Sequence, residues 1–171
     1  ATAIRDSLAE RGFADVRLDI IGREGWGNET DMLRRHPRVR LRGYLTAADA
    51  KAAIESADLY LCTSHDEGLG LPLIEVQFGG LQVVAPDAPV FREVLGASGL
   101  FIDPAAPEAA AAAIADILAA PGWRARASAA ALANVARWNA IAAQDAACVA
   151  GLITGRRDAT ASDSASAPAT P

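Results

Sequence analysis

The stretch DLYLCTSHDEGLGLPLIEVQF, residues 58–78, predicts a strand, a glycine-containing turn and a short helix in succession. Its first part, 58–64, is a short apolar run of the kind found in buried strands. Pro72 is favoured at the first position of a helix, which we expect to continue to about Phe78, where a pair of glycines follows. A strand that leads directly into a helix is half of the unit from which parallel sheets are built.

The same alternation continues on both sides of this stretch. Further strands are predicted at 16–21, 38–43, 81–85 and 99–103, and further helices at 1–11, 46–57, 89–96 and 107–120. Thr46 and Asp49 form a capping box at the start of one helix, and either Asn28 or Thr30 is a suitable cap for a short helix that reaches about residue 36. Because strands alternate with helices and crossovers are right-handed, we expect an α/β fold with a Rossmann-like, doubly wound parallel sheet.

The composition changes along the chain and predicts three parts. Residues 1–121 carry the strand and helix alternation and form the α/β domain. Residues 122–154 are rich in alanine and predict C-terminal helices, with a break near Trp138. Residues 155–171 are small, polar and proline-containing, and we expect a disordered tail.

The bulk properties exclude several classes of protein. The chain of 171 residues has a formal net charge of −5, which argues against nucleic acid as a partner. It has no apolar run of the roughly 18 residues that span a bilayer, and its charged, amphipathic N-terminus is not a secretory signal. We expect a cytoplasmic protein, and a peripheral association with the inner face of the membrane stays open. Cys62 and Cys148 are expected to be buried core thiols without a metal.

The turn within the quoted stretch has the features of an anion site. Gly68 and Gly70 remove side chains that would keep a ligand away from the backbone. The N–H groups of residues 68–71, together with the positive end of the helix that starts at Pro72, suit a phosphate or diphosphate. In a parallel α/β sheet this turn lies at the carboxyl ends of the strands, where ligands bind.

Two glutamates flank this turn. A carboxylate can accept hydrogen bonds from two vicinal hydroxyls, so the pair formed by Glu67 before the glycines and Glu75 in the first helical turn suits a nucleotide sugar, with one carboxylate for the ribose diol and one for the hexose hydroxyls. The alternative is that Glu67 is a solvated loop residue and Glu75 a favourable charge near a helix start. Spacing alone leaves both readings open. A metal site is disfavoured, because only His65 and Asp66 lie nearby.

The segment EGLGLPLIE, residues 67–75, resembles the E-x7-E segment of retaining glycosyltransferases of the GT-B fold, family 4. The surrounding segments are similar to those of that family in the same order: VRLDIIG at 16–22, the run from RVRLRG to LYLCTS at 38–64, and the run from GLQVVA to AAAAAI at 80–114. The resemblance covers roughly residues 1–150.

The resemblance implies a nucleotide-sugar-binding domain that lacks its first strand and forms the C-terminal half of a two-domain, hexosyl-transferring enzyme. The resemblance also implies that the enzyme needs no metal, and that it needs no cofactor because the nucleotide-diphosphate sugar is its substrate. The N-terminal acceptor domain would be the missing partner, and we expect this chain to be inactive alone. The Arg and Lys that the family directs at the diphosphate precede the first helix and are absent here.

The resemblance also implies roles for single residues. Glu67 would be catalytic, contacting the transferred sugar and stabilising positive charge in the transition state, and Glu75 would hold the ribose hydroxyls. The remaining donor-binding residues implied are Gly68, Leu69, Gly70 and Leu71 at the sugar and diphosphate, and Gly22, Gly43, Tyr44 and Leu45 at the base and ribose.

The sequence leaves one other function open and disfavours several more. A non-catalytic binding or interaction module, which needs a partner chain with the acceptor domain, is the main alternative. Other GT-B enzymes are disfavoured. The E-x7-E segment argues against a sugar-nucleotide epimerase. A relative of the glycogen-type phosphorylases would need a lysine for pyridoxal phosphate, and the one lysine of the sequence, Lys51, falls in a predicted helix. No GxGxxG motif follows the first strand, which disfavours an ordinary dinucleotide-binding domain.

Overall fold

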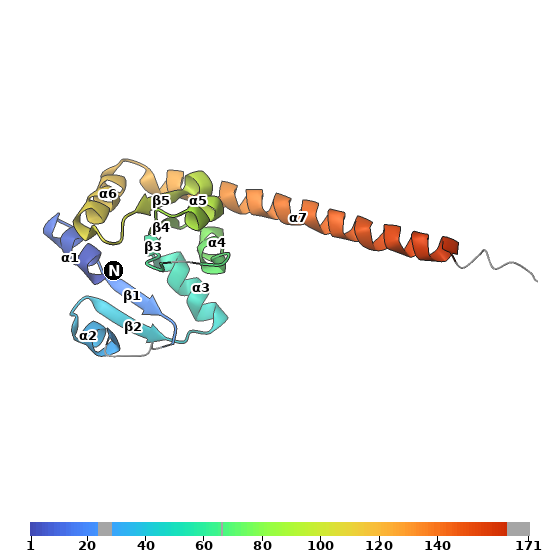
Figure 1. Ribbon diagram of the computed structural model, residues 1–171. Helices are drawn as coiled ribbons and strands as arrows, with labels where there is room; N and C mark the ends of the chain where they lie inside the picture. The colour runs from blue at the N-terminus through green and yellow to red at the C-terminus, as the bar shows by residue number, and fades with distance from the viewer. Residues whose placement is uncertain (24–28, 66, 164–171) are drawn as a thin grey trace, which may run out of the picture. The chain divides into compact units, whose positions relative to one another are not determined.

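The computed structural model describes residues 1–23, 29–65 and 67–163 (Figure 1). The chain divides into two compact units, Ala1–Asn134 and Val135–Pro171. The elements are α1 (Thr2–Glu10), β1 (Leu18–Ile21), α2 (Glu29–Arg35), β2 (Val39–Gly43), α3 (Ala47–Ser56), β3 (Leu59–Leu61), α4 (Leu71–Phe78), β4 (Gln82–Pro86), α5 (Pro89–Leu95), the 3-10 turn η1 (Gly96–Ser98), β5 (Gly99–Ile102), α6 (Pro107–Ala119) and α7 (Trp123–Asp163). Every strand predicted from the sequence is present, so the α/β class is confirmed.

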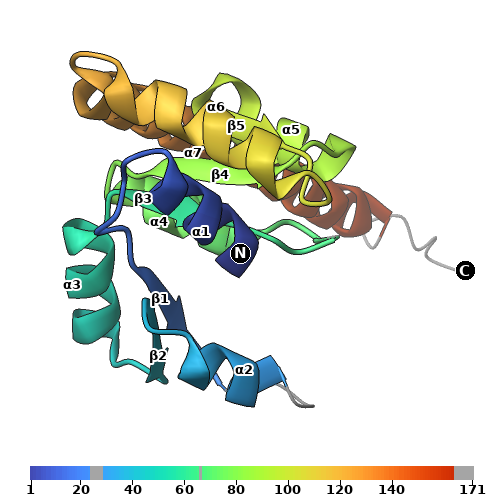
Figure 2. The same cartoon turned by 90° about the vertical axis from the view of Figure 1, so that its left-hand side faces the viewer.

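The strands pair in parallel, as expected, but they form two sheets. β1 pairs with β2, while β3, β4 and β5 form a second sheet in that order. The parallel α/β architecture is as expected, with the strands of the described residues divided between two sheets. Strands pair only when their backbones lie about 4.8 Å apart. β1 and β3 lie apart from one another (Figure 2), and residues of both strands line one cavity.

The main core forms where α1 and α6 pack side by side against the sheet of β3, β4 and β5 (Figure 2). Ile4 and Leu8 of α1 meet Ile114 of α6 and Val84 and Ile102 of the strands, and all of these side chains are buried. Burying such a side chain contributes roughly 1.5–3 kcal/mol. This packing holds α1 against the β3–β5 sheet, although the chain continues from α1 into β1 of the other sheet.

The start of α3 confirms a local prediction. The backbone N–H of Asp49 donates to Oγ1 of Thr46 at 3.1 Å, and the Thr46 hydroxyl donates to the Asp49 carboxylate at 2.7 Å. Both bonds join residues three apart, which is why sequence spacing was enough to find them. The predicted Asn28 cap lies outside the described residues.

The C-terminal region differs from the prediction, because α7 is one helix that passes through Trp138 without a break. Alanine is the best helix former and no proline interrupts this stretch. The helix also continues past Gly155 to Asp163, into the part predicted to be a disordered tail, and 164–171 lie outside the described residues.

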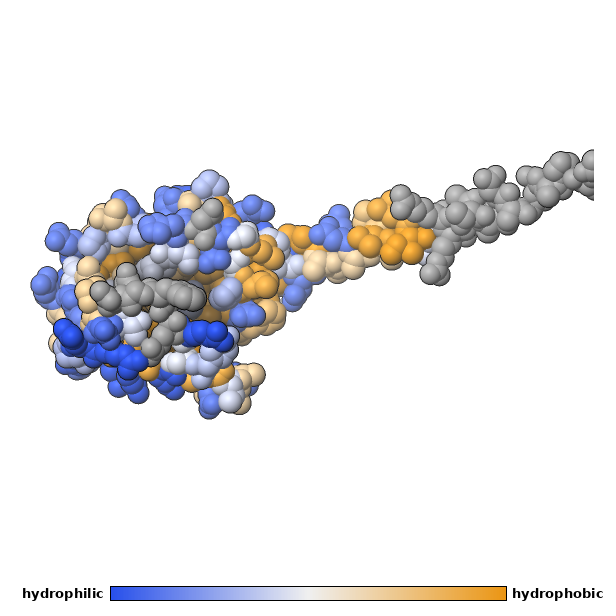
Figure 3. Space-filling view, turned by 60° about the horizontal axis from the view of Figure 1, so that its bottom comes forward, coloured by the Kyte–Doolittle hydropathy of each residue, from blue (hydrophilic) through white to orange (hydrophobic). Residues whose placement is uncertain are grey.

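The exposed part of α7 also corrects the expectation for one cysteine. Cys62 is buried, but Cys148 is exposed, because residues 139–154 of α7 are exposed on all sides of the helix. Apolar side chains gather near the far end of this stretch (Figure 3), where Val149, Leu152 and Ile153 are exposed. No helix in the described part of the chain is both long and apolar enough to cross a bilayer.

Candidate functional site

The turn that leads into α4 depends on glycine at one position. Gly70 is the N-cap of α4 and has φ 64° and ψ 47°, in the left-handed region. Its carbonyl accepts a hydrogen bond from the Leu73 N–H at 2.8 Å, and a Cβ at Gly70 would lie 2.8 Å from Cδ1 of Leu73. A Cβ at Gly68 would meet no heavy atom within 4 Å. The backbone therefore needs glycine at Gly70, while Gly68 leaves open space beside the turn.

Glu67 and Glu75 both affect the pKa of Tyr60 on β3. Burial raises the pKa of Tyr60, and negative charge on Cys62, Glu67 and Glu75 raises that pKa further. Burial is the larger cause, and the charges of both carboxylates add to it at the same phenol. Two sequence-predicted residues thus influence Tyr60, which sequence reasoning missed although it stands in the strand that leads to the turn.

The exposures of the turn residues fit a surface that a ligand can reach. Glu67 is half-buried and Glu75 is exposed. Leu69 is 48% exposed and Leu71 58% exposed. Glu75 was expected in the first turn of its helix, but the first turn contains no acidic residue. The helix begins at Leu71, one residue earlier than predicted, so Glu75 is in the second turn.

The second predicted group lies at the carboxyl ends of β1 and β2. The Gly22 N–H donates to the Gly43 carbonyl at 2.9 Å, which joins the two predicted loops directly. Both glycines have positive φ, 132° and 65°. Tyr44 is 80% exposed, and the Arg23 guanidinium carbon lies 5.8 Å from its ring centroid, while Leu45 is half-buried. An exposed aromatic ring stacked with a guanidinium offers a flat surface for a base.

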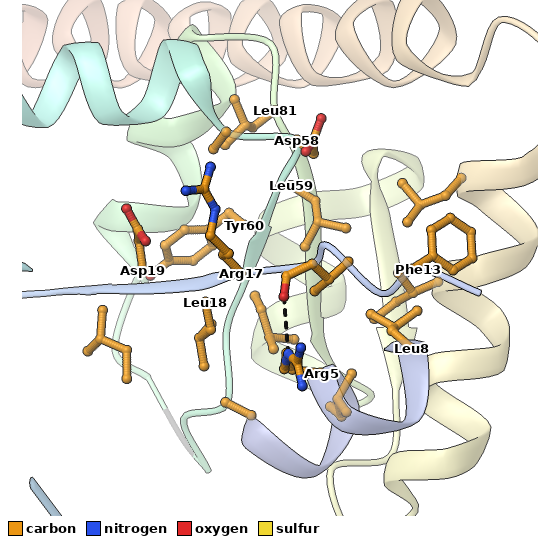
Figure 4. A pocket seen from close by; sticks show the side chains of 18 of the residues that line it. Arg5, Leu8, Phe13, Arg17, Leu18, Asp19, Asp58, Leu59, Tyr60 and Leu81 are labelled. Carbon is orange, nitrogen blue, oxygen red and sulfur yellow. Dashed lines mark hydrogen bonds between the residues drawn. The ribbon is translucent and has the colours of Figure 1, made fainter. Parts of the chain in front are cut away.

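A cavity of about 1080 Å³ lies between β1 and β3 (Figure 4). Leu18 of β1 and Leu59 and Tyr60 of β3 are among the residues that line it. None of the predicted donor-binding residues lines this cavity. The predicted residues therefore form two groups at strand ends, one around Tyr60 and the α4 turn and one around Gly22 and Gly43. Within the described ranges, no group of three or more His, Cys, Asp or Glu is arranged to hold a metal ion.

Comparisons with known proteins identify the family of the first 120 residues. A family model described as "Glycosyl transferases group 1" matches residues 1–120. A serotype-specific mannosyltransferase WbdA of Escherichia coli is 31% identical over 113 residues, which is 61% of this chain and 14% of that protein. The O-antigen chain mannosyltransferase B of Escherichia coli is 30% identical over 127 residues, 71% of this chain and 33% of that protein. The chain thus spans about a seventh and a third of the length of these two curated relatives.

Solved structures show a similar fold. The crystal structure of TarM superimposes with a TM-score of 0.64 at 23% identity, covering 77% of this chain and 28% of that one. The pneumococcal O-GlcNAc transferase GtfA, solved in complex with UDP and GlcNAc, gives a TM-score of 0.59 at 19% identity, covering 83% of this chain and 31% of that one. These likenesses confirm the expected fold class, that of the GT-B glycosyltransferases.

Proposed function

Because the chain belongs to the "Glycosyl transferases group 1" family, we propose that its α/β unit binds the nucleotide-diphosphate sugar from which a retaining glycosyltransferase transfers a hexose. The observation that carries the proposal is the arrangement at the end of β3. A turn that requires glycine at Gly70 leads into α4. Glu67 and Glu75 lie on either side of this turn in the sequence, and their negative charges both raise the pKa of Tyr60.

The diphosphate binds at the turn and at the start of α4. The first N–H groups of a helix point toward a ligand at its N-terminus, and the helix dipole adds a positive field there. The open space at Gly68 lets the diphosphate approach the backbone of Gly68, Leu69, Gly70 and Leu71 closely. The chain's net negative charge does not prevent this, because the field of a helix end is local.

Each of the two carboxylates binds one sugar ring of the donor. Glu75 accepts hydrogen bonds from the ribose hydroxyls. Glu67 accepts hydrogen bonds from the transferred hexose and stabilises the positive charge that develops as the bond from the anomeric carbon to the phosphate oxygen breaks. The leaving phosphate takes the proton of the acceptor hydroxyl as the new glycosidic bond forms on the same face. This step uses no protein base and no metal.

The base lies against the second group of residues. Gly22 and Gly43 are joined by a hydrogen bond and carry no side chains that would block a ligand, and Tyr44 offers an exposed ring. Leu45 supports this loop from a half-buried position. We place the base and its ribose here, with the hexose and diphosphate at the α4 turn.

The transferred sugar is mannose in this proposal, which is supported by the names of the two curated relatives. The acceptor is bound by a second domain, which this unit requires for turnover because positioning two substrates supplies much of the rate acceleration. The unit alone therefore binds the donor without transferring it.

Isothermal titration of the 171-residue chain with GDP, UDP, GDP-mannose and UDP-GlcNAc tests the proposal. Glu75→Gln should weaken every nucleotide that binds by about tenfold to a hundredfold, the effect of losing hydrogen bonds to a charged group. Glu67→Gln should leave GDP and UDP affinity unchanged and weaken only the sugar-linked forms. Glu55→Gln, on exposed α3, makes the same charge change away from the site and should alter neither.

The non-catalytic alternative gives different results. If no nucleotide binds to the wild-type chain, or if Glu75→Gln and Glu55→Gln bind equally, the donor assignment is wrong. If the nucleotides bind but Glu67→Gln does not lower turnover in the full enzyme that carries this unit, the catalytic role of Glu67 is wrong and the unit only binds.

A further inference from the structure

Helix α1 contacts the β3–β5 sheet with its apolar side chains and the segments before β1 and β2 with its polar ones. Ile4 and Leu8 are buried in the main core against β4 and β5. We propose that Asp6 of α1 and His36, which follows α2, are positioning residues for the donor. Their contact fixes the β1–β2 sheet relative to the β3–β5 sheet and so aligns the two sides of the donor site. This inference rests on the proposed function.

The polar side of α1 holds the segments that lead into β1 and β2. Nε of Arg5 donates to the carbonyl of Val16, just before β1, at 3.1 Å (Figure 4). Nε2 of His36, just before β2, lies 3.1 and 3.2 Å from the two carboxylate oxygens of Asp6. Arg5 also donates to Asp6 at 2.7 Å, so one carboxylate serves both residues. One helix thus holds the approaches to both strands of the β1–β2 sheet.

The backbone next to His36 sets which ring nitrogen carries the proton. Nδ1 of His36 accepts a hydrogen bond from the Arg38 N–H at 3.4 Å. A neutral imidazole has one N–H, so its proton is on Nε2, the atom that contacts Asp6. The His36 side chain is 20% exposed and the Asp6 side chain 48% exposed, so the donor is largely shielded from water. A hydrogen bond to a carboxylate is stronger than one between neutral groups.

The two sides of the proposed donor site are on different sheets. Gly22 follows β1 and Gly43 ends β2, whereas Gly70 leads into α4 after β3. Among the described residues, β1 and β2 pair only with each other. A ligand that contacts both sides loses affinity in proportion to the time that the two sheets spend out of alignment. The contact between Asp6 and His36 therefore affects the donor without touching it.

A neighbouring ion pair supplies a matched control. Nη1 of Arg38 lies 3.4 Å from Oδ1 of Asp15, but both residues belong to the segments before β1 and β2, so their contact does not join the two sheets. The Asp15 side chain is fully exposed, and exposed ion pairs contribute little to stability. Asp15→Ala therefore removes an acid close to Asp6 without removing the proposed link.

Distances between two spin labels test the alignment without any ligand. Met32→Cys in α2 and Phe78→Cys in α4 are exposed label sites, 69% and 61% exposed before substitution. Cys148→Ser removes the exposed native thiol, and Cys62 is buried. With Asp6 and His36 intact, this label pair should give one narrow distribution of distances.

Three variants of the labelled chain separate the link from its surroundings. His36→Leu removes the N–H donor and should broaden the distribution. His36→Gln keeps an N–H donor of similar reach and should restore most of the narrow distribution. Asp15→Ala should leave it unchanged. A distribution as narrow in His36→Leu as in the wild type would overturn the inference.

Two ligands of different reach extend the test to the donor site. Mannose 1-phosphate contacts only the α4 side in the proposal, whereas GDP-mannose contacts both sides. His36→Leu should weaken GDP-mannose by about tenfold, the scale of a hydrogen bond to a charged group, and should leave mannose 1-phosphate unchanged. His36→Gln should recover most of the affinity for GDP-mannose. Isothermal titration measures GDP-mannose, and the amide shifts of Gly68 and Gly70 follow mannose 1-phosphate.

A double variant checks that the two residues act through one contact. Asp6→Ala combined with His36→Leu should weaken GDP-mannose no more than His36→Leu alone, because the first change has already removed the link. Additive losses would contradict the shared role.

The remaining outcomes distinguish this inference from the proposed function. Equal losses of both ligands in His36→Leu would show that the residue only stabilises the fold. Wild-type binding of GDP-mannose that His36→Leu leaves unchanged would refute the positioning role alone. If the wild-type chain binds neither ligand, the proposed donor site is wrong and the positioning role is wrong with it.

Discussion

The buried side-chain amide of Asn134 donates a hydrogen bond to Oε1 of Gln77 at 2.6 Å, across 57 residues of sequence. Gln77 in turn donates from Nε2 to Oγ of Ser98 at 2.7 Å, and Asn134 also donates to the Val94 carbonyl at 3.0 Å. All three side chains are buried. This network joins α4, the helix that carries Glu75, to the start of α7 and to the turn after α5.

Gln77→Leu should lower the free energy of unfolding by about 1–3 kcal/mol, because it leaves an Asn134 N–H buried without its acceptor. Urea unfolding measures the change. Asn134→Leu added to Gln77→Leu should cost less than the sum of the two single changes, because the orphaned donor is then gone. Strict additivity would show that the two amides are not coupled.

Gly70→Ala should lower the free energy of unfolding by about 1–3 kcal/mol, because alanine is strained at φ 64° and its Cβ would press on Leu73. Gly68→Ala is the matched control, since its Cβ would enter open space and its φ is not in the positive region. Thermal or urea unfolding should show a near-zero change for Gly68→Ala. Equal effects of the two variants would contradict the special role of Gly70.

Tyr60 should ionise above the ordinary tyrosine range, because burial and then nearby negative charge raise its pKa. A Tyr44→Phe background leaves Tyr60 as the one tyrosine, so its tyrosinate absorbance can be followed. Glu67→Gln and Glu75→Gln should each lower the pKa of Tyr60. A pKa that neither variant moves would place the carboxylates too far from the phenol to share a site.

The raised pKa of Tyr60 also makes the free energy of unfolding depend on pH in the alkaline range. A phenol whose folded pKa is raised stays protonated in the folded chain after it ionises in the unfolded one. The contribution of Tyr60 is therefore complete below about pH 10 and is lost as pH rises through its folded pKa. Tyr60→Phe should remove this loss, as urea unfolding on both sides of pH 10 would show.

Asp6 should make the fold sensitive to acid. The Arg5 guanidinium bonds its carboxylate at 2.7 Å and lowers its pKa, and His36, with Nε2 3.1 Å from the same oxygen, lowers that pKa further. A lowered folded pKa means stability that is present above about pH 4 and is lost as pH falls through the folded value. In Asp6→Asn, the free energy of unfolding measured with urea should change less between roughly pH 5 and pH 2 than it does in the wild type. An unchanged slope of this free energy against pH would contradict the pairing of Asp6 with Arg5 and His36.

The elements were predictable where the signal is local. The Thr46 and Asp49 cap, the proline at the start of α4 and the apolar strand runs involve residues within a few positions of one another, and the structure has each of them. Alanine-rich α7 was also predicted to be helical. Its predicted break at Trp138 was wrong, because one aromatic residue costs a helix too little to end it.

The candidate site was predicted in part. The run from Glu67 to Glu75 was found from its glycines, its proline and its two acids. Tyr60 was missed, because its role depends on burial and on charges brought near by the turn. Gln77, Ser98 and Asn134 were missed, because nothing in their local sequence relates residues 21 and 57 positions apart.

By itself, the sequence determined the order of strands and helices, the glycine-dependent turn before α4 and the membership of a glycosyltransferase family. These properties depend on neighbouring residues, whose spacing is written directly in the chain. Only the tertiary structure decided that the strands of the described residues form two sheets with a cavity between β1 and β3, and that Asn134 is hydrogen-bonded to Gln77. Such relationships arise when packing brings distant segments together, and no local pattern records which edges and amides will meet.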